Sequence, residues 1–104
     1  METISLVLNR AGINGLEGKE DAEHVTEWVK VAFTAVTEAG AQPAMHLLIR
    51  RVVDKFEKLD AKATSIELEP MDLHLIRWAL LSANFPGHSA KMACLILNLF
   101  GITL

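Results

Sequence analysis

The sequence predicts an all-α protein, with four main helices in a small bundle and a short extended N-terminal arm. Beyond residue 20, apolar residues recur at the spacing of amphipathic helices. Pro43, Pro70 and Pro86 interrupt that pattern, as is typical of helix starts and turns. The chain of 104 residues is 51% apolar and 22% charged, which indicates one folded core. We therefore expect a single domain over residues 1–104, with 1–20 as arm and loop and 21–104 as the helical core.

The first element is a short stretch rich in β-branched residues, from Thr3 to Leu8. Its local pattern fits either a strand or an extended arm, and both alternatives stay open. Residues 11–18 contain three glycines and are expected to form a loop.

The first helix is expected over Asp21 to Glu38. The residues that follow the spacing of a helix with one buried face are Val25, Trp28, Val29, Ala32, Phe33 and Val36. Acidic residues at the start of this helix are favoured by the helix dipole, and Gly40 suits a left-handed helix end.

The second helix is expected from Pro43 to about Leu59 or Lys62. A basic stripe lies opposite its apolar face and consists of Arg51, Lys55, Lys58 and Lys62. The short joint after Gly40 implies an antiparallel hairpin, which places the acidic start of the first helix beside the basic end of the second.

Residues 64–69 alternate weakly, with Ile66 and Leu68 on one side, and are compatible with an extended segment. The third helix is expected over about 71–84 and the fourth over about 90–100. Both are apolar at nearly every angle, and a helix of that kind must be covered on all sides. One alternative is that one helix is central in a monomer. We expect instead that a second copy covers part of this surface, in a homodimer built on the third and fourth helices.

Several large side chains are candidates for a partner or dimer interface. They are Trp28, Phe33, His74, Arg77, Trp78, Leu81, Leu95 and Leu99. Tryptophan is favoured at interfaces because it supplies contact area at a small entropic cost, although core packing is the alternative for each aromatic residue. His74 and Arg77 are the polar interruptions of the third helix, so they either hydrogen-bond across an interface or mark its exposed edge.

No motif for catalysis, metal binding or cofactor binding occurs in the sequence. There is no phosphate-binding loop, no Gly-x-Ser-x-Gly and no Cys-x-x-Cys. His24 and Glu27 share a helix face but lack further ligands, and are expected to be solvated. Cys94 lies among apolar residues and is expected to be a buried, inert thiol. We therefore expect a protein that is not an enzyme and holds no cofactor.

Membrane and nucleic-acid roles are disfavoured by the charge pattern. The start of the chain lacks the basic region of a signal peptide, and no run of about 18 apolar residues occurs, so we expect a cytoplasmic protein. The net charge of −3 opposes binding to phosphates. The third helix, turn and fourth helix superficially suggest a helix-turn-helix, but the fourth helix lacks polar base-reading residues. The basic stripe is then the only candidate nucleic-acid face.

Two apolar segments, together with the small size and acidity of the chain, carry a resemblance. They are Met71-Asp72-Leu73-His74-Leu75-Ile76-Arg77-Trp78 and Ala93-Cys94-Leu95-Ile96-Leu97. In size and pattern, residues 21–100 resemble the small all-helical antiactivators of LuxR-type quorum-sensing regulators, the QslA-like proteins. The resemblance implies a dimer that occupies the dimerisation surface of a transcription regulator and so prevents DNA binding. It contains no shared motif, so no residue role is carried over.

These observations favour a small regulatory protein that binds and sequesters another protein through apolar helix surfaces. A transcriptional regulator is the expected partner. Two alternatives stay open: a phage-type assembly or adaptor protein, and a nucleic-acid-associated factor that uses the basic stripe.

Overall fold

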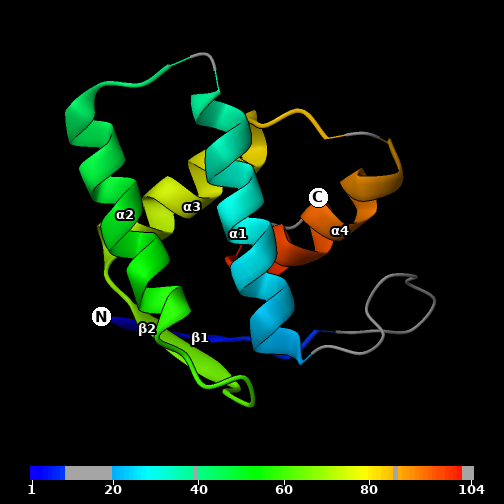
Figure 1. Ribbon diagram of the computed structural model, residues 1–104. Coiled ribbons are helices and arrows are strands. Elements are labelled where there is room, and N and C mark those ends of the chain that lie inside the picture. Colours follow the sequence, from blue (N-terminus) through cyan, green and yellow to red (C-terminus); the bar gives the residue numbers. More distant parts are fainter. Residues whose placement is uncertain (9–19, 39, 86, 102–104) are drawn as a thin grey trace.

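Four helices and one two-stranded sheet make up the part of the chain that the computed structural model describes, residues 1–8, 20–38, 40–85 and 87–101. In chain order the elements are β1 (Glu2–Ser5), α1 (Asp21–Thr37), α2 (Pro43–Glu57), β2 (Ser65–Leu68), α3 (Pro70–Ser82) and α4 (Gly87–Leu99), as Figure 1 shows. The expectation of four main helices is confirmed, and their ends differ from the expected ones by a few residues. The loop expected over residues 11–18 lies outside the described residues.

The N-terminal stretch is a strand and not a free arm. β1 pairs antiparallel with β2, with Ile4 opposite Ile66. The backbone N–H of Leu6 continues this pairing by donating to the carbonyl of Thr64 at 2.8 Å. Leu6 and Leu8 are buried, whereas Val7 is exposed. The arm expected from the sequence is therefore corrected to a paired strand, because its alternate side chains are buried in the core.

The first two helices form the expected antiparallel hairpin (Figure 1). Gly40 adopts a φ of +115°, a conformation that side-chain-bearing residues rarely adopt, and so permits the turn after α1. Pro43 then opens α2 at its first turn. Glu20 and Asp21 at the start of α1 line a small pocket together with Lys62, so the acidic start of α1 does lie beside the basic end of the α2 region.

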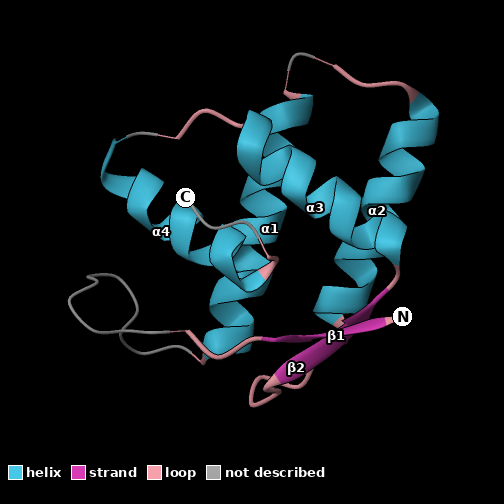
Figure 2. Cartoon of the chain, turned by 180° about the vertical axis from the view of Figure 1, so that it is seen from behind, coloured by secondary structure: helices cyan, strands magenta, loops and turns pink. Residues whose placement is uncertain are grey.

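The third helix crosses the hairpin on one side, behind α1 and α2 in Figure 1 and in front of them in the reverse view of Figure 2. α1 packs more extensively against α3 than against α2. The core lies between the hairpin, α3, α4 and the sheet. Its largest fully buried side chains are Phe56, Phe100, Leu6, Leu68, Ile76, Ile96, Val25, Val29 and Val52.

One chain covers most of both apolar C-terminal helices. In α3 the buried apolar residues are Leu73, Leu75, Ile76, Ala79 and Leu80, and in α4 they include Met92, Ala93, Ile96 and Leu97. We expected a second copy to cover part of the surface of these two helices. The single chain covers these residues by itself, so they do not require a second copy. Figure 2 shows the reason, because α3 lies across the hairpin and α4 lies beside α1.

Two single-residue expectations are also corrected. Cys94 is exposed, on a stripe of α4 that it shares with the exposed Lys91 and Asn98. The apolar pattern of α4 does not show which side faces solvent, and the spacing of these three residues does. His24 is buried, with only 3% of its surface exposed, on the same inward side of α1 as Val25.

A buried carboxylate joins α2 to the start of α3. Asp72 is 4% exposed and lies in the first turn of α3. Its carboxylate accepts a hydrogen bond from the Glu69 backbone N–H at 3.0 Å, and it forms an ion pair with the Lys55 ammonium on α2. A carboxylate at a helix N-terminus is also favoured by the helix dipole. Burial of this charge is therefore tolerated only because both partners are in place.

The end of α4 is held in a similar way by a side chain of α3. The Arg77 guanidinium donates from Nε to the carbonyl oxygen of Phe100 at 2.5 Å. Gly101 follows with a φ of +87°, and a Cβ placed there would lie 3.0 Å from an Arg77 nitrogen. Arg77 thus satisfies a carbonyl at the C-terminus of α4, where helices leave acceptors unpaired.

We predict that Asp72→Ala lowers the free energy of unfolding by about 2–4 kcal/mol, because it removes the Glu69 hydrogen bond and leaves Lys55 without its partner. Asp72→Asn keeps the hydrogen bond and is expected to cost less. Urea unfolding followed by circular dichroism measures both. The control is Asp54→Ala, which breaks an exposed pair with Arg50 and is expected to cost less than about 1 kcal/mol. Equal losses for Asp72→Ala and Asp54→Ala would contradict the structural role of the buried carboxylate.

Candidate functional site

A groove lies between α1 and the chain around the C-terminal end of α2, and we call it the α1–α2 groove. α1 forms one wall from Ala22 to Glu38, and Phe56 to Ala61 form the other wall. Its volume is about 900 Å³, which is large enough for several side chains of a partner.

The two sides of α1 have different compositions, and the outward side lines the groove. Its inward side is buried through Val25, Val29 and Ala32. Its outward side presents Glu23, Glu27, Val31, Thr34 and Glu38, which recur at three- or four-residue spacing. Val31 is 44% exposed and lies between these polar residues. The outer face of α1 is therefore an acidic stripe with an apolar residue at its centre.

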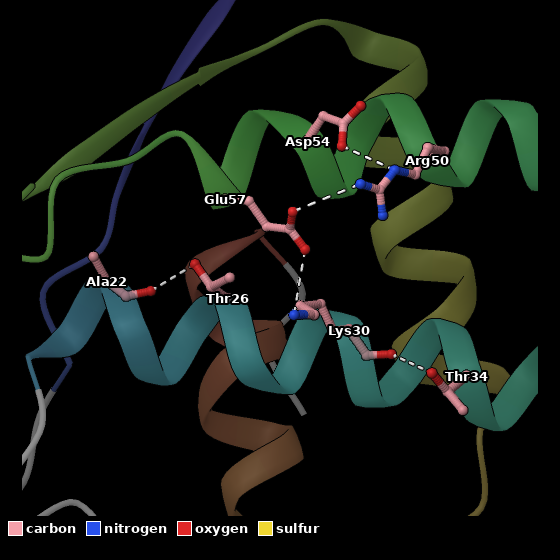
Figure 3. Close-up of polar contacts among 7 residues, drawn as sticks. All are labelled: Ala22, Thr26, Lys30, Thr34, Arg50, Asp54 and Glu57. Atoms are coloured by element: carbon pink, nitrogen blue, oxygen red, sulfur yellow. Dashed lines mark hydrogen bonds and ion pairs between the residues drawn. The ribbon is translucent and has the colours of Figure 1, made fainter.

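Threonine hydroxyls in the groove are already used within α1. The Thr26 hydroxyl donates to the carbonyl of Ala22 at 2.8 Å, and the Thr34 hydroxyl donates to the carbonyl of Lys30 at 3.0 Å (Figure 3). Such back-bonding leaves a threonine with little donor capacity toward a ligand. The groove therefore offers carboxylates and apolar atoms rather than hydroxyl donors.

One ion pair connects the two walls, and two further pairs lie within α2 (Figure 3). The Lys30 ammonium on α1 lies 3.3 Å from one carboxylate oxygen of Glu57 on α2, and the Arg50 guanidinium lies 3.8 Å from the other. Arg50 also pairs with Asp54 at 3.0 Å. All four side chains are more than one-third exposed, so these pairs contribute little to stability. The carboxylate of Glu57 nevertheless offsets the positive charge of Lys30.

The groove carries net negative charge. Its described lining residues include five carboxylates, of Glu23, Glu27, Glu38, Glu57 and Asp60, against one basic residue, Lys30. The apolar part of the lining includes Val31, Ala35, Leu59 and the buried ring of Phe56. An apolar floor with an acidic rim favours a ligand that is both apolar and cationic.

The aromatic candidates on α1 lie away from this groove. Phe33 is 3% exposed and belongs to the core, so its own chain already covers the surface that the sequence assigned to a partner. Trp28 is partly buried, and its ring lies 5.6 Å from that of Phe85 in the connection between α3 and α4. Both side chains therefore stabilise the fold of the single chain.

The candidates on α3 and α4 differ widely in exposure. Arg77 donates a hydrogen bond to the carbonyl oxygen of Phe100, and Leu95 and Leu99 are partly buried against the core. Trp78 lines a smaller pocket of about 220 Å³ with Val36 and Met45. His74 and Leu81 are exposed. The eight candidate residues consequently do not form one surface, and of these eight only His74, Leu81 and the partly exposed Trp78 share an outward side of α3.

The basic stripe is interrupted. Lys55 is committed to the buried carboxylate of Asp72, whereas Arg51, Lys58 and Lys62 are exposed. Because the charge of Lys55 is paired inside the protein, the stripe has fewer positive charges that can bind phosphates.

Two searches restricted to the described residues gave no site of another kind. Among residues 1–8, 20–38, 40–85 and 87–101, no group of three or more His, Cys, Asp or Glu residues is arranged to hold a metal ion. None of the described helices combines the length and the apolar character that crossing a bilayer requires.

Comparison of the chain with protein families, with curated proteins and with solved structures found no match. The groove is therefore interpreted from its own geometry and charge.

Sequence reasoning missed the α1–α2 groove, although part of its signal is present. Glu23, Glu27 and Glu38 stand on one helix face with Val31 between them, a pattern that periodicity alone reveals. The opposite wall comes from residues 56–61, and its position depends on how α1 and α2 pack against each other. That packing is a tertiary property without a local sequence signal.

We predict very different losses of stability for truncation of two residues of α1, Phe33 and Val31. Phe33→Ala is expected to lower the free energy of unfolding by about 3–5 kcal/mol, because it leaves a cavity in the core. Val31→Ala is expected to change it by less than about 0.5 kcal/mol, because Val31 is exposed and packs little. Thermal and urea unfolding of both variants test this. A large loss for Val31→Ala would show that this residue is not a groove residue but part of the core.

Proposed function

We propose that this chain is a small cytoplasmic regulatory protein that binds and sequesters another protein, with a transcriptional regulator as the class of partner. The α1–α2 groove is the observation that carries the proposal. It is a concave surface of about 900 Å³ with apolar residues on its floor and carboxylates on its rim, and concave, largely apolar surfaces with a few polar groups are suited to binding. The partner class comes from the resemblance in size and acidity to helical antiactivators.

Binding is a better explanation of the groove than catalysis. The described lining residues include no histidine, cysteine or serine that would act as a base or nucleophile. Two of the threonine hydroxyls are held by carbonyl groups of α1. The carboxylates stand around an open apolar surface, an arrangement that supports recognition of a partner.

A nucleic-acid role through the basic stripe is less well supported. Lys55 is held by Asp72, and the chain as a whole carries a net charge of −3. A protein of this charge gains little from counterion release on a phosphate backbone.

Self-association is a second candidate, and one observation favours it. Met71, His74, Trp78 and Leu81 follow one side of α3 at helical spacing, and Met71 and Leu81 are each 54% exposed. Two large exposed apolar residues on one helix side offer a self-complementary patch to a second copy. A homodimer, or a larger assembly of the adaptor type, would use this outer side of α3, which the groove does not include.

The sequestration proposal predicts a stoichiometric protein partner. The tagged chain is purified from its native host with nuclease treatment, and the eluate is analysed by mass spectrometry. We expect a transcriptional regulator in equal amount. The Lys58→Gln/Lys62→Gln variant is expected to recover the same partner, because it removes two of the three exposed charges of the stripe without disturbing Lys55 and Asp72. Recovery of the chain alone would contradict sequestration, and loss of the partner in this variant would favour the basic stripe as the site.

The self-association candidate predicts a mass of twice 11.5 kDa in light scattering coupled to size-exclusion chromatography. Leu81→Glu is expected to yield a monomer, because a buried, unpaired charge opposes the contact. Leu47→Glu is the matched control, since Leu47 is 70% exposed on α2, and it is expected to remain a dimer. A monomeric wild-type chain at high concentration would exclude this candidate.

A further inference from the structure

We propose that the α1–α2 groove receives an amphipathic helix of a partner protein that carries lysine or arginine residues near both of its ends and apolar residues at its centre. This inference rests on the proposed function, because it names the chemistry of the partner segment. It goes further in assigning the groove as the site and in specifying the order of charges along the ligand.

The length of the groove sets the length of the segment. Its α1 wall runs from Ala22 to Glu38, which corresponds to about 24 Å at 1.5 Å per residue. A partner helix of about 16 residues spans this distance along α1, and one half of it would also contact the shorter wall of residues 56–61. A shorter ligand would leave one end of the acidic stripe without a counterpart.

Carboxylates lie at both ends of the groove, in addition to Glu27 and Glu57 between them. Glu23 and Asp60 are at the end formed by the start of α1 and the residues after α2, and Glu38 is at the other end. Glu23 and Glu38 have no ion-pair partner among the described residues. A cationic side chain at each end of the ligand would complement these carboxylates.

The middle of the groove calls for apolar side chains. Val31 is exposed there, Ala35 lies one turn further along α1, and Phe56 forms part of the floor. Lys30 is also central, but Glu57 already offsets its charge. Leucine-sized residues at the centre of the ligand would remove Val31 from water. Burial of apolar surface contributes a favourable free energy of binding that exposed ion pairs do not provide.

A neighbouring pocket of about 280 Å³ also borders the Lys30–Glu57 pair and contains Arg50, Lys30 and His46 besides Glu57. Its lining is not dominated by carboxylates. The cationic helix is therefore assigned to the α1–α2 groove and not to this pocket.

Three synthetic peptides of about 16 residues test the proposal with the full-length chain. The first is a fluorescein-labelled amphipathic helix with lysines in its first and last turns and leucines at its centre. The second has the same composition with the lysines at the centre and the leucines at the ends. The third replaces every lysine of the first by glutamate. Fluorescence anisotropy at low salt measures binding, and we expect saturable one-to-one binding of the first peptide, at least tenfold tighter than that of the other two.

Two pairs of variants locate the binding site. Val31→Arg places a cation and a long side chain at the centre of the groove, and it is expected to weaken binding of the first peptide more than tenfold. Leu47→Arg adds the same charge at an exposed apolar position outside the groove, and it is expected to bind like wild type. Glu23→Gln/Glu38→Gln is expected to weaken binding about three- to tenfold. Its control, Glu2→Gln/Glu67→Gln, removes two exposed charges from the sheet and should have little effect.

Several results would overturn the proposal. They are absence of saturable binding of the first peptide up to about 1 mM, equal binding of the three peptides, and equal effects of Val31→Arg and Leu47→Arg. Self-association of the wild-type chain that Val31→Arg abolishes and Leu81→Glu does not would identify a second copy as the occupant of the groove instead.

The outcome can be separated from that of the proposed function. If a regulator co-purifies with wild type and equally with Val31→Arg, sequestration holds and the groove assignment fails. If the first peptide binds in the groove but no protein partner co-purifies, the groove assignment holds and sequestration fails.

Discussion

The buried carboxylate of Asp72 is the constraint on which the arrangement of the helices depends. A charge with 4% exposure must be paired, and its two partners come from α2 and from the residue that precedes α3. This requirement fixes the start of α3 against α2. Because β2 ends at Leu68, two residues before α3 begins, the same contact also fixes the sheet beneath the hairpin. One side of the hairpin is thereby covered by α3, and the other side stays open.

This one-sided cover explains why a chain with a full core still exposes apolar surface. α1 buries its inward residues mainly against α3, so its outward face is not needed for folding. The floor of the groove is nevertheless firm, because Phe56 is 1% exposed and packs edge-on against Phe100, with ring centroids 6.3 Å apart. A firm floor lowers the conformational cost of binding, since few groups must be ordered when a partner arrives.

Local patterns predicted the helices and one half of the sheet, but not the contacts between distant segments. The periodicity around Val25 and the glycine at position 40 were sufficient for α1 and its end, because helix signals lie within one or two turns. Ile66 and Leu68 indicated β2. The pairing of β1 with β2 joins segments about 60 residues apart, and neither segment identifies the other. Cys94 was wrongly expected to be buried for a related reason. The composition of α4 shows that this helix is apolar, but it does not show which side of the helix other segments cover.

The rim of the groove and its floor differ in what they contribute to the folded state. The carboxylates of Glu23 and Glu38 and the exposed pair of Lys30 with Glu57 contribute little to stability, since water screens them. They are therefore free to vary with the requirements of a ligand, whereas Phe56 is fixed by the core. A site built in this way combines a rigid apolar surface with charges that the fold does not need. That separation allows binding specificity to change without loss of the fold, and it is the physical reason for locating function on the outer face of α1 rather than on the buried aromatic residues of α1.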